Sequence, residues 1–415
     1  MRHDVFLPAG IALPLTPEKL SRAVAALADR GPQALAAVGE AALLAVWAET
    51  VQAFRDPGSL ERQALDPALA RRCRLSPAGL TAGLEAVLGG VREEPAAALF
   101  ARARSHREGA SRAGPVLAVL AGNLPALAVQ PLLPALALGR PVFLKSPSAE
   151  PLFAPAFLGA LTRREPRLGD ALAAAAWPGG DAALEAPVLA GVGTVLAYGG
   201  QEALDDLERR APGKLVRYGP QTSLAVVAAD ADPAAVAPGL ARDVALFDQR
   251  GCLSVAAVYV EGTQGDAEEL AARLAAALSE LARLWPPGPA EPGAAAAVQQ
   301  LRLVAEMRGL YLPATRLPLG AGTVIVDPKP AFQPSPGLRT VRVHPLADLG
   351  RLPEILAPWR GRLQGAALAG EEAWALEPRL IQLGFSRFAA PGELQSPDAT
   401  WTNGGIDPLA ALGGA

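Results

Sequence analysis

The sequence is poor in the side chains that build metal centres, disulfide frameworks and histidine-based catalytic sites. Among its 415 residues there are two cysteines and three histidines, and their positions match no zinc-ligand spacing. Two cysteines in a chain of this length also exclude a disulfide framework. The formal net charge is −3, which provides no basic footprint for nucleic acid or for an anionic membrane. We therefore expect no metal site and no nucleic-acid partner.

Long apolar runs are also missing. Residues 116–138 come closest to the ~20 uninterrupted apolar residues that a membrane helix needs, but Asn123, Gln130 and three prolines interrupt them. The first eight residues contain no apolar core of signal-peptide length. We expect a soluble, cytoplasmic protein with no membrane span.

Short apolar segments, in contrast, are abundant. Hydrophobic residues make up 51% of the chain, and its length predicts two domains or one domain with inserted segments. Residues 1–112 have a mainly helical pattern. Thr16-Pro17 and Ser76-Pro77 each place a capping side chain before a proline, which is typical of a helix start.

From residue 114 onward, strands and helices alternate. Apolar strands are expected at residues 115–120, 141–145, 171–177 and 193–198, with amphipathic stretches between them. Prolines inside residues 125–138 predict a kink or a late start for the helix there. The β-α-β series predicts a doubly wound parallel sheet in an α/β fold.

Cys252 is the residue with the greatest chemical interest. It follows a helical pattern at residues 233–246 and precedes an apolar strand at residues 255–260, next to the flexible Gly251. Such a junction suits a nucleophile, although a lone cysteine is also commonly a small buried hydrophobe. The other cysteine, Cys73, lies among arginines that should lower its thiol pKa, and we interpret it as structural.

Two earlier segments favour the interpretation of Cys252 as a nucleophile over that of a buried hydrophobe. The turn Gly122-Asn123-Leu124-Pro125 is followed by a strand that continues as Lys145-Ser146-Pro147-Ser148. This order resembles the aldehyde dehydrogenase superfamily, which has an Asn-x-Pro turn and then a strand ending in Lys-Pro-Ser. Tyr198-Gly199-Gly200 corresponds to its Gly-Ser turn before a helix, and Cys252 to its catalytic cysteine. The similarity extends over residues 114–262.

Within that superfamily the chain resembles the acyl-CoA reductase (LuxC-like fatty acid reductase) family. The segment Asp248-Gln249-Arg250-Gly251-Cys252 is similar to the Asp-Gln-x-x-Cys of that family. The tail, with Gly384, Arg387, Gly392 and Trp401, resembles its C-terminal signature. The resemblance thereby covers most of residues 114–405 and little of the first 110.

The resemblance implies both a fold and a domain order. A helical N-terminal segment, residues 1–112, would pack on a Rossmann-type NAD(P)-binding domain, residues 113–222. A second α/β domain, residues 223–375, would carry Cys252, and a tail, residues 376–415, would return to the cofactor domain. The superfamily usually oligomerises, so a dimer or tetramer is expected.

The implied activity is NAD(P)H-dependent reduction of a long-chain acyl-CoA to the fatty aldehyde through a cysteine thioester. NADPH is the expected cofactor, with NADH as the alternative. The acyl donor would be acyl-CoA or an acyl-protein synthetase. Cys252 would be the nucleophile, and Asn123 would donate to the developing oxyanion.

The resemblance also assigns cofactor-binding residues. Lys145, with Ser146 beside it, would contact the adenosine ribose or a 2′-phosphate. Gly199 and Gly200 would open a helix whose N-terminus accepts a phosphate or ribose. Each of these residues also has a plain structural interpretation: Asn123 as a turn residue, Lys145 as the end of a strand, and the glycines as a tight turn.

Departures from the superfamily pattern keep alternatives open. The general-base glutamate of the hydrolytic enzymes is replaced, in register, by Arg217, and the glutamate that holds the nicotinamide ribose has no clear match. The tail has Asn403-Gly404 where the family often has His-Asp. The alternatives are a glutamyl-phosphate-reductase-like enzyme of the same superfamily and a degenerate, non-catalytic scaffold that binds acyl groups or a partner.

Overall fold

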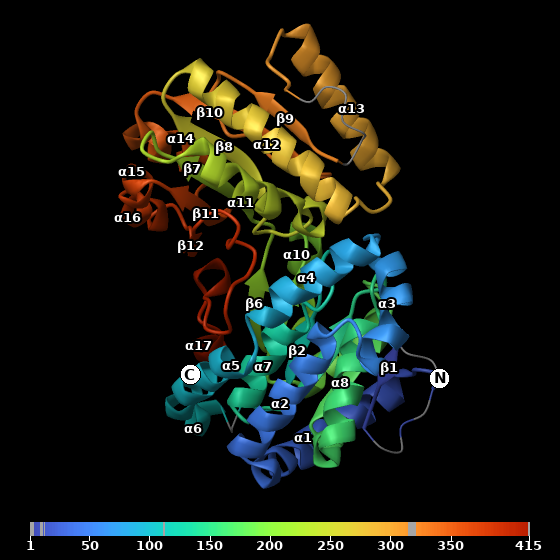
Figure 1. The fold of residues 1–415 in the computed structure, drawn as a ribbon. Coiled ribbons are helices and arrows are strands. Elements are labelled where there is room, and N and C mark those ends of the chain that lie inside the picture. The colour runs from blue at the N-terminus through green and yellow to red at the C-terminus, as the bar shows by residue number, and fades with distance from the viewer. Residues whose placement is uncertain (1–3, 9–10, 12, 111–112, 314–320, 414–415) are drawn as a thin grey trace.

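The computed structural model describes residues 4–8, 11, 13–110, 113–313 and 321–413. It contains two six-stranded sheets, and Figure 1 shows one in each half of the molecule. In sheet A the strand order is β1-β4-β3-β2-β5-β6, and in sheet B it is β12-β11-β7-β8-β10-β9. The strands of sheet A are β1 (Val5–Phe6), β2 (Val116–Val119), β3 (Val142–Ser146), β4 (Leu172–Ala176), β5 (Thr194–Tyr198) and β6 (Lys214–Tyr218).

The predicted doubly wound α/β sheet is confirmed in sheet A. Strands β2 to β6 pair in parallel, and a helix follows each of β2 to β5. The order reverses around β2, which pairs with β3 on one side and β5 on the other. In open α/β sheets this reversal opens a crevice at the carboxyl ends of the strands. The helices are α7 (Val129–Ala137), α8 (Phe153–Arg164), α9 (Ala182–Gly191) and α10 (Gln201–Arg210).

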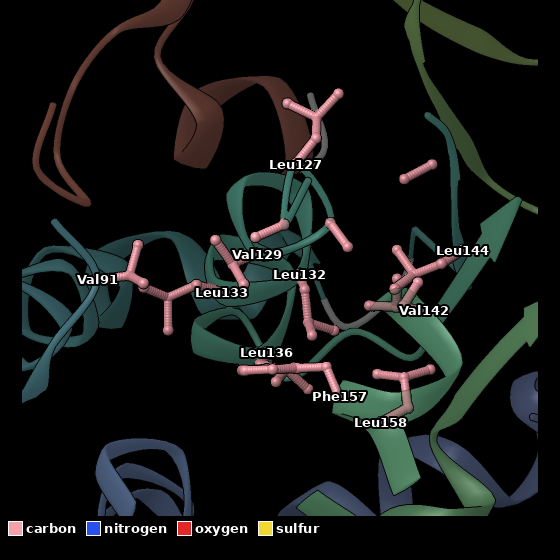
Figure 2. Packing of buried hydrophobic residues seen from close by; sticks show 14 of the residues in the cluster. Val91, Leu127, Val129, Leu132, Leu133, Leu136, Val142, Leu144, Phe157 and Leu158 are labelled. Carbon is pink, nitrogen blue, oxygen red and sulfur yellow. The ribbon is translucent and has the colours of Figure 1, made fainter. Parts of the chain in front are cut away.

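Helix α7 has the late start that its prolines predict. It begins at Val129, four residues after Pro125, and ends before Gly139, whose φ of 73° is in the left-handed region. Between turn and helix, Ala126 also has a positive φ. Figure 2 shows apolar side chains of α7, such as Leu132 and Leu136, packed among those of β3 and α8. This packing fixes the turn that carries Asn123.

The N-terminal part is largely helical, as predicted, and covers both faces of sheet A. Helix α1 packs with α9 and α10 on one face, and the next helices pack with α7 and α8 on the other. Thr16 and Ser76 cap α1 and α4 through their side-chain oxygens. The helices are α1 (Pro17–Val38), α2 (Glu40–Arg55), α3 (Leu60–Cys73), α4 (Pro77–Gly89), α5 (Glu93–Ala103) and α6 (Arg107–Ala110).

One N-terminal element departs from the helical prediction. Residues of β1 (Val5–Phe6) add an antiparallel edge strand beside β4. A strand of two residues has no alternation that a sequence pattern could reveal. Within the described ranges no single helix combines the length and apolar character needed to cross a membrane, and the α1–α2 pair meets that test only jointly, across a 92° bend.

Sheet B is entirely parallel in its strand pairs and is also covered on both faces. Helices α11 and α12 pack on one face, and α14 to α16 on the other. Its strands are β7 (Thr222–Val227), β8 (Val255–Glu261), β9 (Thr323–Val326), β10 (Thr340–Leu346), β11 (Leu363–Ala369) and β12 (Arg387–Ala389). The helices are α11 (Pro233–Ala245), α12 (Gln264–Leu284), α13 (Pro292–Met307), α14 (Leu352–Leu356), α15 (Glu371–Trp374) and α16 (Glu377–Ile381).

The C-terminal tail belongs to both halves. Its first part adds β12 to the edge of sheet B, where it pairs with β11. The chain then runs along the side of the molecule to α17 (Pro408–Leu412), which packs against α7 (Figure 1). We expected residues 376–415 to form a tail that returns to the cofactor domain; in the structure the first part of this range belongs to sheet B, and its last part packs on α7 of the half that contains sheet A. The three residues of β12 are too few to reveal a strand pattern.

A buried arginine holds the end of this tail. Arg140 donates from its guanidinium to the Leu412 carbonyl at 2.6 Å and to the carbonyls of Ala113 and Gly114 at 2.8 and 2.9 Å. The same side chain donates to Thr194 Oγ1 at 3.1 Å. Arg140 thereby joins α17 to the amino ends of sheet A strands, far from the carboxyl-end crevice.

Candidate active site

A cavity of about 440 Å³ lies where the two halves and the tail meet. Sheet A contributes residues that follow the carboxyl ends of its strands, sheet B contributes the cysteine loop, and the tail forms one wall. Among the predicted site residues, the cavity is lined by Asn123, Gly199, Gly200 and Cys252. Most of the other lining side chains are apolar or aromatic, as in sites that bury an organic ligand.

The loop before Cys252 has an unusual backbone. Phe247, Asp248 and Gln249 have φ values of 56°, 52° and 64° in succession. Left-handed backbone costs a residue with a Cβ roughly 1–2 kcal/mol, so three in a row require strong support. The tight left-handed turn lets the chain leave α11 and enter β8 with Cys252 facing the cavity.

Side chains of the same loop provide that support. Asp248 forms a buried ion pair with Arg339, with 2.7 Å between its carboxylate and the guanidinium. Gln249 donates from Nε2 to the carbonyls of Val255 and Thr340, and accepts at Oε1 from the Thr340 N–H at 2.7 Å. These bonds tie the loop to the starts of β8 and β10. The Asp-Gln pair of the motif therefore braces the loop that presents the cysteine.

Three further contacts fix the turn around Cys252. Ser223 Oγ at the start of β7 donates to the Cys252 carbonyl at 2.8 Å. Ser254 Oγ donates to Gln395 Oε1 of the tail at 3.1 Å. Gly251 lies so close to Gln395 that a Cβ there would be 2.9 Å from its Oε1. The turn is thereby held against both sheet B and the tail.

The two cysteine thiols differ in their surroundings. Burial raises the pKa of Cys252 to about 11, and its own N–H, that of Leu253 and the side chain of Gln364 lower it in part. Burial raises the pKa of Cys73 to about 12, and the lowering by Arg250 is a smaller effect. Our expectation that arginines lower the pKa of Cys73 is therefore wrong, because desolvation outweighs them. Its burial agrees with the structural interpretation.

Asn123 lies beside the cysteine loop. Its Nδ2 donates one hydrogen to the Arg250 carbonyl at 3.0 Å, across the boundary between the two sheets. The amide carries a second hydrogen, and the exposed side chain lines the same cavity as Cys252. The asparagine is thus placed to donate to a carbonyl oxygen of a substrate held at the thiol.

The Gly199-Gly200 turn has open space in front of a helix N-terminus. Gly200 precedes α10, has no side-chain cap, and an added Cβ there would meet no atom within 4 Å. Unpaired N–H groups at a helix start attract phosphate or hydroxyl oxygens. Beside the turn, Tyr198 and Tyr218 stack with centroids 4.4 Å apart. This open, polar edge next to a flat aromatic pair fits a nucleotide cofactor.

Lys145 and Ser146 lie elsewhere on the same sheet edge. In the described part of the chain, neither lines the cavity that holds Cys252. Lys145 is 6% exposed, its ammonium lies 5.8 Å from the centroid of the Trp177 ring, and burial lowers its pKa. Ser146 Oγ is buried and has no hydrogen-bond partner among the described residues. Both stand at the carboxyl end of β3, next to the crevice strand β2.

The described lining of the cavity holds few groups that could activate water. Arg217, in the register of the missing glutamate, pairs with Asp205 and Glu208 of α10. Among the described lining residues Asp398 is the only carboxylate, and its Oδ1 already accepts from the N–H and hydroxyl of Thr400. No histidine is among those lining residues.

Comparison with known sequences identifies the family. The model of the family described as acyl-CoA reductase (LuxC) matches residues 75–414. The chain belongs to the acyl-CoA reductase (LuxC) family. The match includes α4 and α5, so it begins well before the segment from residue 114 in which the motifs were recognised.

Two relatives of this LuxC-family chain share one name. A long-chain acyl-protein thioester reductase of Aliivibrio fischeri is 26% identical over 236 residues, which are 56% of this chain and 48% of the relative. One from Photorhabdus laumondii is 26% identical over 163 residues, 38% of this chain and 34% of the relative. The matched segments therefore span less than half of these relatives.

Solved structures support the fold of this LuxC-family chain. Aldehyde dehydrogenase 21 from Physcomitrella patens has a TM-score of 0.73 at 15% identity, over 96% of this chain and 89% of the other. An aldehyde dehydrogenase from Mycobacterium tuberculosis, crystallised with NAD+, has a TM-score of 0.69 at 16% identity, over 91% and 83%. The predicted aldehyde dehydrogenase-like fold is confirmed.

Some residues of the site were not selected from the sequence. Tyr218 and Gln364 line the cavity, and Asn403, noted only as a departure from the family pattern, lies beside Gln364. Gln364 carried one usable signal, because it is the only polar side chain in the apolar strand β11. Tyr218 carried none, since a tyrosine at the end of a strand usually packs.

Proposed function

We propose that this chain is a nicotinamide-dependent reductase that converts a long-chain acyl-CoA to the fatty aldehyde through a thioester on Cys252. The observation that carries the proposal is the shared cavity of Cys252, Asn123 and the Gly199-Gly200 turn. Its predominantly apolar lining suits an acyl group. Membership of the family and the names of its relatives support the same reaction class.

The first step is acyl transfer to the thiol. Cys252 Sγ, as the thiolate, attacks the carbonyl carbon of the acyl donor, and the new S–C bond forms. The bond from that carbon to the donor sulfur then breaks, and the donor leaves as a thiolate. Asn123 and the Cys252 N–H donate to the carbonyl oxygen while it carries negative charge, and one such donor is typically worth about 3 kcal/mol.

The second step releases the aldehyde. When bound, NADPH, with NADH as the alternative, supplies the hydride that reduces the thioester carbon. Asn123 again donates to the oxygen as it becomes negative, and the Cys252 thiolate leaves with the electron pair of the S–C bond. Gly199, Gly200 and the start of α10 would hold the cofactor near the thiol, and Lys145 and Ser146 would hold its adenosine end.

The replacement of the general-base glutamate by Arg217 favours aldehyde as the product. In an aldehyde dehydrogenase-like site, a carboxylate near the thioester can activate water and release a free acid. Here the side chain in that register is Arg217, which pairs with Asp205 and Glu208 of α10. The thioester therefore persists until it is reduced.

The acyl donor and the assembly are part of the proposal. The relatives are named for acyl-protein thioesters, which supports an acyl-protein synthetase as a donor alongside acyl-CoA. We also propose that the chain forms a dimer or tetramer, because members of the superfamily usually oligomerise.

The test is a product assay with purified protein, a series of acyl-CoA chain lengths and either NADPH or NADH. Aldehyde and free acid are quantified together, and Cys252→Ala is assayed in parallel. We expect aldehyde from the wild type, with little acid, and neither product from Cys252→Ala. Acid in excess of aldehyde would contradict the mechanism. No product, together with no thermal shift on adding either cofactor, would support the non-catalytic scaffold instead.

A further inference from the structure

A buried glutamine lies at the reactive thiol. Gln364 is 1% exposed and is the only polar side chain of β11, whose other residues are alanine, glycine and leucine. Its side chain lines the cavity of Cys252. Burying an amide in an apolar strand is unfavourable unless the amide is hydrogen-bonded. The hydrogen bonds of the Gln364 side chain therefore indicate its role.

The amide of Gln364 uses its nitrogen and leaves its oxygen unpaired. Nε2 donates to Asn403 Oδ1 at 2.6 Å. The side chain lines the same cavity as Cys252 and lowers the pKa of its thiol in part. Oε1 is buried and has no partner among the described residues. A buried acceptor without a partner costs about 1–3 kcal/mol. This orientation gives Nε2 its bond to Asn403, and the amide nitrogen carries a second hydrogen in the cavity of Cys252.

Asn403 fixes that orientation. It belongs to the short turn Asn403–Gly405 of the tail and accepts one of the two Nε2 hydrogens. The other hydrogen is thereby available to the sulfur. The following residue, Gly404, has a φ of 60°, and a Cβ there would lie 3.1 Å from Gln221 Oε1. The tail is therefore packed closely enough to hold the asparagine in place.

We propose that Gln364 is a catalytic residue that donates a hydrogen bond to the Cys252 thiolate, and that Asn403 is a positioning residue that aims its amide. The catalytic part of this inference rests on the proposed function. Gln364 stabilises the anionic sulfur twice, before it attacks the acyl donor and again when the S–C bond breaks and the electron pair returns to sulfur. No proton is transferred by the amide in either step.

Thiol alkylation tests the hydrogen bond without substrate or cofactor. The rate of iodoacetamide addition to Cys252 is measured by intact mass from pH 6 to 10.5, and Cys252→Ala accounts for any labelling of Cys73. Gln364→Met keeps the length of the side chain and removes the donor. For Gln364→Met we expect the curve of alkylation rate against pH to shift by about one unit toward higher pH. At pH 8 the reaction should then be roughly tenfold slower. Asn403→Ala should move the curve in the same direction by less.

Gln130→Met is the matched control, because Gln130 lines the same cavity from α7. Its alkylation profile should equal that of the wild type. A wild-type profile for folded Gln364→Met would overturn the inference, as would an equal shift in the control. If Gln364→Met does not fold, Gln364→Glu is measured instead. A carboxylate in that place repels the thiolate, so alkylation should be slower still, and an unchanged rate would refute the hydrogen bond.

The two proposals can fail separately. Alkylation that follows these expectations in a protein that makes no aldehyde would reject the reductase and leave the hydrogen bond standing. Aldehyde formation by Gln364→Met with wild-type kcat and alkylation would reject the role of Gln364 alone. If both proposals hold, Gln364→Met should lower kcat about tenfold with little change in KM, since it leaves the apolar lining intact.

Discussion

The strained loop before Cys252 gives the sharpest prediction about stability. Three left-handed residues cost about 3–6 kcal/mol together, and Gln249 is one of their main supports. Gln249→Met preserves the volume of the side chain and removes its bonds to Val255 and Thr340. The Thr340 N–H and the Val255 carbonyl would then be buried without a partner, at about 1–3 kcal/mol each. We therefore expect a loss of about 2–6 kcal/mol in the free energy of unfolding.

Urea unfolding followed by circular dichroism measures this loss as a lower midpoint. The control is Gln201→Met, at an exposed position where the side-chain amide donates to Asp205 on the same helix. Its effect should stay within about 0.5 kcal/mol. A change in Gln249→Met as small as that of the control would refute the idea that Gln249 supports the left-handed turn.

Three other predictions concern the tail, the pH dependence of stability and the packing of α4. Arg140→Met should destabilise the fold by at least about 3 kcal/mol, because it leaves several buried carbonyls unpaired, and limited proteolysis should then cut the tail first. Burial raises the pKa of Asp243 to about 7 from an ordinary value of 3.8, so folding favours its protonated form. The stability it provides is full below about pH 4 and is lost as pH rises to about 7, by up to about 1.4 kcal/mol per pH unit. The urea midpoint of the wild type should therefore fall between about pH 4 and 7 by more than that of Asp243→Asn, which lacks the titrating carboxyl. Equal pH dependence of the two midpoints would contradict the prediction. Gly83→Ala would put a Cβ 2.4 Å from the Phe247 ring of the cysteine loop and should cost about 1–3 kcal/mol. Gly89→Ala on the same helix, with no atom nearer than 3.7 Å, should be neutral or stabilising in thermal unfolding.

Local pattern was sufficient for much of the fold. The alternation of apolar strands and amphipathic helices predicts sheet A, and the prolines after Asn123 predict the late start of α7. The caps at Thr16 and Ser76 also follow from the residues alone. These features depend on neighbours in the sequence, so a single chain reveals them. The edge strands β1 and β12 are too short to do so.

The candidate site was only partly predictable, because its members meet across long separations. Cys252 and Asn123 could be paired only through the resemblance to a known family, since the bond from Asn123 to the Arg250 carbonyl of the cysteine loop joins residues more than a hundred positions apart. The contact of Gln364 with Asn403 depends on where the tail crosses from sheet B to sheet A. No local pattern encodes that crossing, so the sequence could mark Gln364 as a polar residue in an apolar strand but could not place Asn403 beside it.

The central claim is that Cys252 carries the acyl group as a thioester. The most direct measurement is the intact mass of the protein after incubation with a long-chain acyl-CoA and no cofactor, beside Cys252→Ala. We predict a mass increase of one acyl group on the wild type alone, which disappears on adding NADPH as aldehyde is released. An unchanged mass with every acyl donor that yields aldehyde, or an equal adduct on Cys252→Ala, would contradict the account.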